Sequence, residues 1–337
     1  MKTNLHFRYL ILYLASLCFV LLNSNLSAQT EGTNNQKDSV TSNLRSEKQL
    51  PILNNFRFIP NEVVYDPFIT TFIKLNIGSG TALDLTSYRK DWNTGEIEDT
   101  LTGDLTYISG ELQFQLAVND WLALNLGAGG TGRLGTNTYT ILTSGISYTT
   151  FLTLGGKAKI WENDKMVLST TLDFKYQSIY LYSIYDFIKE VVETGGIDST
   201  STMLEKDNVS QTFLNVNYAY APTDWCGILA QAGWGLGEAF ETKTRGNVRV
   251  GAAFSVDFDN VDAIEFPIGI LASVKYNSFG EGGSDVKDIF TYGFKIAYTG
   301  HKDFDIGIEN TYQSLSYKSS DEKIKTILSS FSLRYYF

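Results

Sequence analysis

Hydrophobic and polar residues alternate along most of the chain, and the last seven positions show the pattern most clearly. In this segment serine, arginine and tyrosine share one face of an extended backbone. The other face is wholly apolar and consists of Phe331, Leu333, Tyr335 and Phe337. A strand alternates in this way when one side meets lipid and the other meets a polar interior. The pattern predicts a membrane-spanning strand, with an edge strand of a soluble sheet as the alternative.

The same alternation recurs in eleven further segments. Short connections rich in Asn, Asp, Gly or Pro alternate with longer ones, which is typical of barrels with tight turns at one rim and loops at the other. We therefore predict an all-β fold, a transmembrane antiparallel up-and-down β-barrel of about twelve strands, within a range of roughly ten to fourteen. The predicted strands are 68–88, 104–118, 121–132, 148–160, 166–180, 209–220, 225–238, 247–258, 263–277, 287–299, 303–317 and 324–337.

The first of these strands contains two glycines, Gly78 and Gly80. Apolar residues keep the same parity before and after this break. A chain reversal would not be expected to preserve the register, so the pattern predicts one long strand kinked by glycine.

Charged residues within the strands fall on the face opposite the apolar one. A charge on the lipid face costs about 2 to 4 kcal/mol at the bilayer midplane, which explains this segregation. The predicted lumen residues are Lys74, Asp84, Glu111, Lys157, Lys159, Asp173, Lys175, Arg249, Asp257, Glu265, Lys275, Lys295, Asp305, Glu309 and Arg334. Opposed charges of this kind can line a water-filled path, or they can pair across the interior and fill it.

Three pairs are predicted inside the barrel. Lys295 is expected to lie near Asp305, and Arg334 near Glu309. Two like charges, Asp257 and Glu265, would be adjacent near the turns. Because adjacent carboxylates are destabilising without water or a cation, this third pair slightly favours a water-filled lumen.

The longest connection, 181–208, contains apolar residues at helical spacing followed by two glycines, which predicts a short amphipathic helix. Such a helix outside the membrane must bury its apolar face. It could form a gate over the barrel mouth or pack on other loops. The apolar positions are Ile184, Phe187, Ile188, Val191 and Val192.

The chain before the barrel divides into three parts. Residues 1–28 have a basic start, an apolar run and a small-residue site ending at Ala28, which predicts an export signal cleaved after that residue. Residues 29–50 are polar and predict a disordered leader. Residues 51–67 are apolar but irregular, which suits a periplasmic segment or a short plug before the barrel at 68–337. Signal removal leaves Cys226 alone, so no intrachain disulfide is expected.

Composition argues against several functions. The net charge is −10, with no basic stripe, so no nucleic-acid partner is expected. Barrel enzymes need an imidazole base, and the only histidine after the signal, His301, lies in a predicted turn. We therefore predict no enzymatic activity, no catalytic residue, no metal site and no cofactor.

The aromatic C-terminal strand resembles the C-terminal signal of Gram-negative outer-membrane β-barrel proteins. The resemblance rests on Phe331, Leu333, Tyr335 and Phe337. It implies a location in the outer membrane, with membrane lipids and the barrel assembly machinery as partners. Together with the polar, mixed-charge lumen, it favours a channel or transporter for an unknown small solute.

A second resemblance is to the long-chain fatty acid and hydrophobic-compound transporter family. Phe56, Phe58 and residues 63–65 would correspond to part of that family's N-terminal plug, and Gly78 and Gly80 to a kink that opens a lateral exit. A third hypothesis is a structural or adhesive barrel with a closed lumen.

Overall fold

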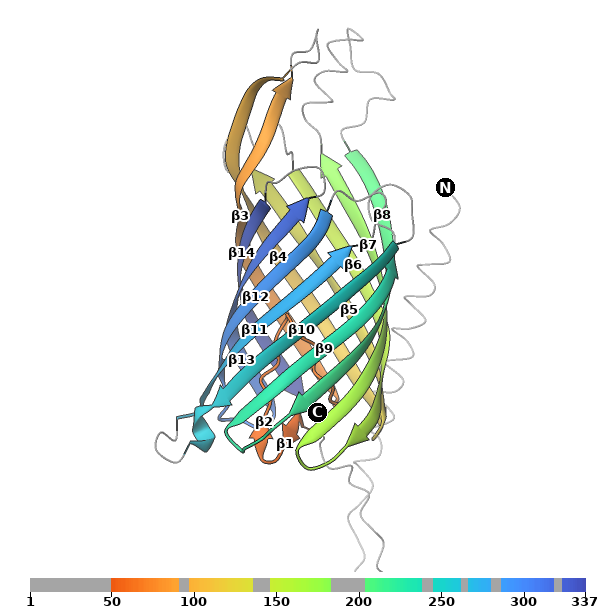
Figure 1. The fold of residues 1–337 in the computed structure, drawn as a ribbon, viewed down its shortest axis with the longest axis vertical. Coiled ribbons are helices and arrows are strands. Elements are labelled where there is room, and N and C mark those ends of the chain that lie inside the picture. The colour runs from red at the N-terminus through yellow and green to blue at the C-terminus, as the bar shows by residue number, and fades with distance from the viewer. Residues whose placement is uncertain are drawn as a thin grey trace, which may run out of the picture. The chain divides into compact units, whose positions relative to one another are not determined.

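The structure is a computed structural model that describes residues 50–90, 97–135, 146–182, 204–237, 245–261, 266–279, 286–317 and 323–337. Twelve strands form one closed barrel in which neighbours in sequence pair antiparallel and β14 closes on β3 (Figure 1). The predicted all-β fold and strand count are confirmed. The strands are β3 (Phe72–Lys90), β4 (Ile97–Asn119), β5 (Leu122–Gly135), β6 (Ile146–Glu162), β7 (Met166–Tyr182), β8 (Leu204–Tyr220), β9 (Cys226–Gly237), β10 (Arg245–Asp257), β11 (Ile268–Phe279), β12 (Val286–Tyr298), β13 (Phe304–Tyr317) and β14 (Lys323–Tyr336).

The two rims of the barrel differ in their connections. We call one rim the turn end, where the connections are 120–121, 163–165, 221–225, 258–267 and 299–303. At the other rim, the loop end, the strands end before and begin after the residues that the structure does not describe, 91–96, 136–145, 183–203, 238–244, 280–285 and 318–322. The C-terminus lies at the turn end, as does a small hairpin of β1 (Ile52–Leu53) and β2 (Phe56–Arg57) (Figure 1).

Helical structure is minimal in the described residues. The one helical element is a 3-10 turn, η1 (Phe258–Asn260). No helix among these residues is long and apolar enough to cross a membrane. β7 continues to Tyr182, and the rest of the predicted gate helix lies outside the described residues.

The outer face of the wall is apolar, as β12 illustrates. Phe294 and Ile296 are 46% and 47% exposed, whereas Lys295 between them is 1% exposed. The same alternation places Lys74 on the inside of β3 between exposed Ile73 and Leu75. Charged side chains of these strands are thus kept away from the surface that would meet lipid.

The wall is continuous at the two glycines of β3. Both pair in register with β14 and with β4. A Cβ on Gly80 would lie 2.2 Å from the carbonyl oxygen of Ile327, to which the Tyr107 hydroxyl donates a hydrogen bond of 3.1 Å. One long strand is confirmed, and glycine allows Tyr107 to lie across it. This pairing leaves no lateral exit at Gly78.

The predicted start of this strand was wrong by four residues. Ile69 continues the apolar parity of the strand, yet Phe68 and Ile69 precede β3 and are 4% and 5% exposed. The Gln115 amide donates hydrogen bonds of 3.1 and 2.8 Å to the carbonyls of Phe68 and Thr70. This side chain directs the backbone into the barrel instead of along its wall.

Candidate functional site: the N-terminal segment inside the barrel

Residues 50–71, here called the N-terminal segment, lie inside the barrel towards the turn end (Figure 1). Their large apolar side chains form one buried cluster with small and aliphatic inward residues of the wall. Glycines make room at several of these contacts. A Cβ on Gly227 would lie 2.2 Å from the Phe56 ring, and one on Gly269 would lie 2.4 Å from Ile59 Cδ1. The cluster contains Leu53, Phe56, Phe58, Ile59, Val63, Val64, Phe68, Val167, Ala219, Ala221, Leu229, Ala253, Leu271 and Ala297.

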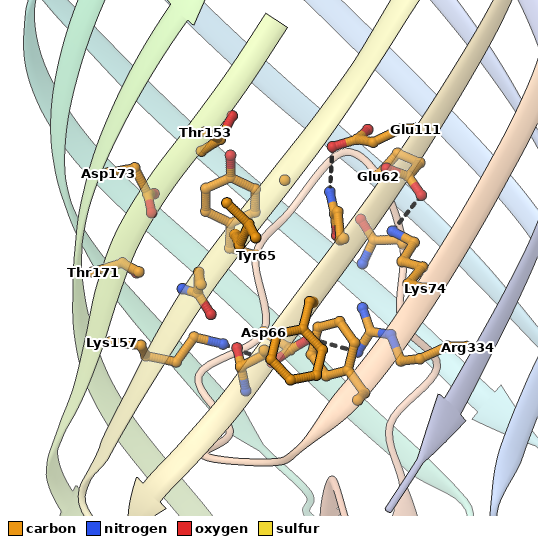
Figure 2. A pocket seen from close by; sticks show the side chains of 18 residues that line it. Glu62, Tyr65, Asp66, Lys74, Glu111, Thr153, Lys157, Thr171, Asp173 and Arg334 are labelled. Atoms are coloured by element: carbon orange, nitrogen blue, oxygen red, sulfur yellow. Dashed lines mark hydrogen bonds and ion pairs between the residues drawn. The ribbon is translucent and has the colours of Figure 1, made fainter. Parts of the chain in front are cut away.

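Asp66 joins two sides of the barrel. Its carboxylate accepts from Lys157 Nζ of β6 at 3.1 Å and from Arg334 Nη1 of β14 at 3.0 Å (Figure 2). Burial alone would raise the pKa of Asp66, but the two cations outweigh it and hold that pKa well below its usual range. Asp66 is therefore ionised and links β6 to β14 on two sides of the barrel wall.

Two further ion pairs fix the segment. Glu62 pairs with Lys74 of β3, and Arg57 pairs with Asp305 of β13 at 3.1 Å. Burial raises the pKa of Glu62, but Lys74 and more distant cations outweigh it, so the net pKa is lowered. The charges of the segment are thus complementary to those of the surrounding wall.

The irregular backbone of the segment is hydrogen-bonded largely by side chains of the wall. Lys295 Nζ donates to the Pro60 carbonyl at 2.7 Å, and the Tyr65 amide donates to Gln231 Oε1 at 3.3 Å. The Glu62 amide donates to both oxygens of Glu309 at 3.1 and 3.2 Å. These bonds satisfy buried backbone groups that have no strand partner.

A polar cavity of about 110 Å³ separates part of the segment from the wall (Figure 2). The Tyr65 ring lies beside Thr153 and Asp173, while Glu111 lies across the cavity. Burial and then Asp173 raise the pKa of Tyr65 to about 12, against the opposing effect of Arg249, so the phenol is neutral at physiological pH. The lining residues are Asn61, Glu62, Tyr65, Asp66, Phe72, Lys74, Glu111, Gln113, Phe114, Gln115, Asn125, Leu126, Gly127, Thr153, Lys157, Thr171, Asp173 and Arg334.

Three cations nearer the loop end are arranged differently. Lys175 Nζ lies 4.4 Å from the Phe151 ring centroid, and Arg249 Cζ lies 3.4 Å from that of Phe213. Lys275 Nζ lies 5.5 Å from the Tyr65 centroid. In the part of the chain that the structure describes, none of the three has a carboxylate within ion-pair distance.

Most predicted lumen residues lie on the inner face. Two fall outside what the structure describes, namely the side chain of Asp84 and residue Glu265. Half-buried inner positions are Glu111, Lys159, Lys175 and Lys275. Buried inner positions are Lys74, Lys157, Asp173, Arg249, Asp257, Lys295, Asp305, Glu309 and Arg334.

The predicted pairs between strands are wrong where the structure describes them. Lys295 lies opposite Glu309 in the β12–β13 register, because the last paired residues at the turn are Tyr298 and Ile306. The connection is therefore longer than the predicted turn, and Asp305 is displaced from Lys295. Arg334 lies opposite Asp305, not Glu309.

The argument for a water-filled lumen is also changed. Asp257 lies opposite Gly269, and its carboxylate accepts a hydrogen bond of 2.8 Å from the Thr299 hydroxyl. Since Glu265 lies outside the described residues, the like-charge pair is not observed. The position of Asp257 therefore favours neither a water-filled lumen nor one filled by paired charges.

Sequence reasoning missed three functional charges, Arg57, Glu62 and Asp66. A usable signal was present, because each is a charged residue in an otherwise apolar segment next to a barrel. Such residues need buried partners of opposite charge. His301, by contrast, lies in an exposed turn, where its Nδ1 accepts from the Asp303 amide at 3.1 Å. The described residues contain no group of metal-ligating side chains.

No family model and no curated protein matches this chain. Among solved structures, an outer-membrane channel from Pseudomonas putida F1 matches with a TM-score of 0.50 and 11% identity, over 83% of this chain and 100% of the other. The β domain of the Bordetella autotransporter BrkA matches at 0.47 and 12%, over 80% and 100%. The translocator domain of NalP from Neisseria meningitidis matches at 0.47 and 10%, over 81% and 90%.

This chain has the fold of an outer-membrane β-barrel protein. At 11% identity, the similarity to the Pseudomonas channel is one of architecture. The individual contacts of the N-terminal segment must therefore carry the functional argument.

Proposed function

We propose that this protein is an outer-membrane channel or transporter whose lumen is closed by its own N-terminal segment and opens to small solutes when that segment moves. The apolar outer face supports insertion in the membrane, and the turn end would face the periplasm. The observation that carries the proposal is the position of Asp66, buried in the barrel between Lys157 and Arg334. One residue of the segment there links β6 to β14 across the interior.

The bonding of the segment would allow it to move without opening the wall. At the turn end, the Asn54 amide donates to the Asp164 carbonyl at 2.8 Å, and Phe337 donates to Thr71 at 3.1 Å. Between these points, the described bonds from segment to wall involve a side chain on at least one partner. Displacement of the N-terminal segment would therefore replace these bonds with hydrogen bonds to water, while every strand of the barrel stays paired.

The alternative of a hydrophobic-compound transporter with a lateral exit is less well supported. Strand pairing is unbroken at Gly78 and Gly80, and Tyr107 lies over the second of them. The path favoured here is axial and is lined by polar and charged groups. The gate helix predicted around 181–193 stays a separate prediction.

Planar-bilayer conductance tests the proposal. Deletion of residues 51–66 removes most of the segment and should convert rare openings into a stable, larger conductance. Deletion of residues 31–46, which is equally long, is the matched control and should behave as the full chain does. Both variants should remain heat-modifiable on gels, which shows that the barrel has folded.

Silence of a folded 51–66 deletion would contradict the channel proposal. It would favour the structural or adhesive barrel, whose lumen has no conducting role. A full-length protein that conducts as well as the deletion would contradict closure by the N-terminal segment instead.

A further inference from the structure

The three loop-end cations, Lys175, Arg249 and Lys275, are here called the cation group. Arg249 and Lys275 lie on the adjacent strands β10 and β11, and Gly251 lies directly opposite Lys275. Lys175 projects from the inner face of β7 towards Phe151. Arg249 and Lys275 lie beside the ring of Tyr65, a residue that also lines the polar cavity.

Arg249 has a vacant hydrogen-bonding edge. The residue is 7% exposed, and its Nε and Nη2 atoms have no hydrogen-bond partner in the described structure. These two nitrogens point their N–H groups in the same direction along one edge of the guanidinium. That edge matches the two oxygens of a carboxylate, which it binds through two parallel hydrogen bonds. A buried guanidinium normally has these donors satisfied.

The acidic groups nearby do not satisfy the cation group. Asp173 Oδ2 accepts from the Asn215 amide at 3.4 Å, and Glu111 Oε1 accepts from the Gln113 amide at 2.6 Å. Neither lies within ion-pair distance of Lys175, Arg249 or Lys275 among the described residues. The neutral Tyr65 phenol supplies no counter-charge. Glu62 is paired with Lys74, so among the described residues the three cations face two unpaired acids, which leaves positive charge in excess there.

Aromatic rings hold the cations in place. Arg249 Cζ lies over the Phe213 ring, and Lys175 Nζ lies over the Phe151 ring. Such contacts orient a cation without neutralising it. An anion in the lumen can therefore meet an oriented guanidinium edge in the same region as two lysine ammonium groups.

We propose that the cation group is a binding subsite for small organic carboxylates, in which the free edge of Arg249 takes the carboxylate and Lys175 and Lys275 add attraction. This inference rests on the proposed transport function, because it names the class of solute that the lumen would carry. The polar cavity beside Tyr65 is the adjoining space for the remainder of such a solute.

Titration calorimetry on the full-length protein in detergent tests the subsite with sodium benzoate, using benzamide as the neutral analogue of the same shape. Benzoate should bind, and benzamide should bind at least about tenfold more weakly. Arg249→Lys keeps the charge but removes the two-pronged edge, and it should weaken benzoate binding by at least about tenfold. Lys206→Met, which removes an exposed lysine of β8, is the matched control and should leave binding unchanged.

Equal binding of benzoate and benzamide would overturn the proposal, as would a folded Arg249→Lys variant with unchanged benzoate affinity. Absence of benzoate binding by the unaltered protein would overturn it too. Failure of the subsite can be distinguished from failure of the channel by comparing these outcomes with the conductance test. Carboxylate binding by a barrel that never conducts would remove the channel and leave the subsite, whereas conductance without binding would do the reverse.

Discussion

The turn end and the loop end of the lumen handle buried charge in different ways. At the turn end, Lys157 and Arg334 each have a carboxylate partner on the N-terminal segment. Nearer the loop end, Lys175 and Arg249 lie against aromatic rings without an ion pair among the described residues. Inward charges are therefore of two kinds, those that hold the segment and those available to a solute.

Two lysines of β6, both near the turn end, show how contact with the N-terminal segment decides the role of an inward charge. Lys157 is 5% exposed and bonds to Asp66 across the interior. Lys159, two residues further on the same face of β6, pairs with the exposed Glu162 of its own strand. Two residues of the same type and parity thus have different roles, because the first pairs with Asp66 of the segment and the second with Glu162.

The largest expected effect comes from removing the Asp66 charge. Asp66→Asn leaves Lys157 and Arg334 buried without their carboxylate, and breaking a buried pair in this way costs about 3 to 5 kcal/mol. The matched control Glu162→Gln breaks an exposed pair and should cost less than about 1 kcal/mol. Unfolding by denaturant in lipid vesicles, followed by the gel shift of the barrel, measures both. Equal midpoints for the two variants would contradict the assignment of Asp66 as a buried anchor that holds the N-terminal segment.

Close packing of the wall itself should give an intermediate effect. Gly80→Ala places a methyl group against the Ile327 carbonyl and the Tyr107 ring, so we expect a loss of about 1 to 3 kcal/mol. Gly110→Ala is the control, since a Cβ there meets nothing within 4 Å. Its free energy of unfolding should change by less than about 1 kcal/mol. If the two variants unfold alike, the close packing of Ile327 and Tyr107 on Gly80 does not contribute to the stability of the wall.

Acid should weaken the turn end by a smaller amount. The folded pKa of Asp66 lies well below the ordinary value of 3.8, so its contribution is complete above that value and is lost as pH falls towards the folded pKa. Lowering the pH from 7 to about 3 should therefore remove about 1 kcal/mol through Asp66. Midpoints measured across this range should fall less steeply for Asp66→Asn. Parallel pH curves for the two proteins would count against an ionised anchor.

The strands could be predicted because each one shows the alternation of apolar and polar residues within its own sequence. Phe294, Lys295 and Ile296 alternate within three residues, and the lipid surface imposes that alternation wherever a strand crosses it. The closed barrel and the inward position of Lys295 follow from this local pattern.

The partners of the inward charges could not be predicted in the same way. Whether Lys295 faces Asp305 or Glu309 depends on the length of a turn, which the period of the strands leaves open. The contacts of Asp66 depend on a segment with no periodicity, whose path is set by Gln115 and by the space that wall glycines leave. The local pattern thus predicts the strands of the barrel wall, whereas tertiary packing determines the path and the contacts of the N-terminal segment inside it.

Closure by the N-terminal segment is tested most directly with a reversible lock. A Cβ on Gly251 would lie 3.1 Å from Val64 Cγ2, so Val64→Cys with Gly251→Cys, in a Cys226→Ser background, places two thiols within reach of a disulfide. In the Asp66→Asn protein, which should open readily, the oxidised lock should abolish bilayer conductance and a reductant should restore it. Equal conductance of the oxidised and reduced forms would contradict the central claim that this segment closes the lumen.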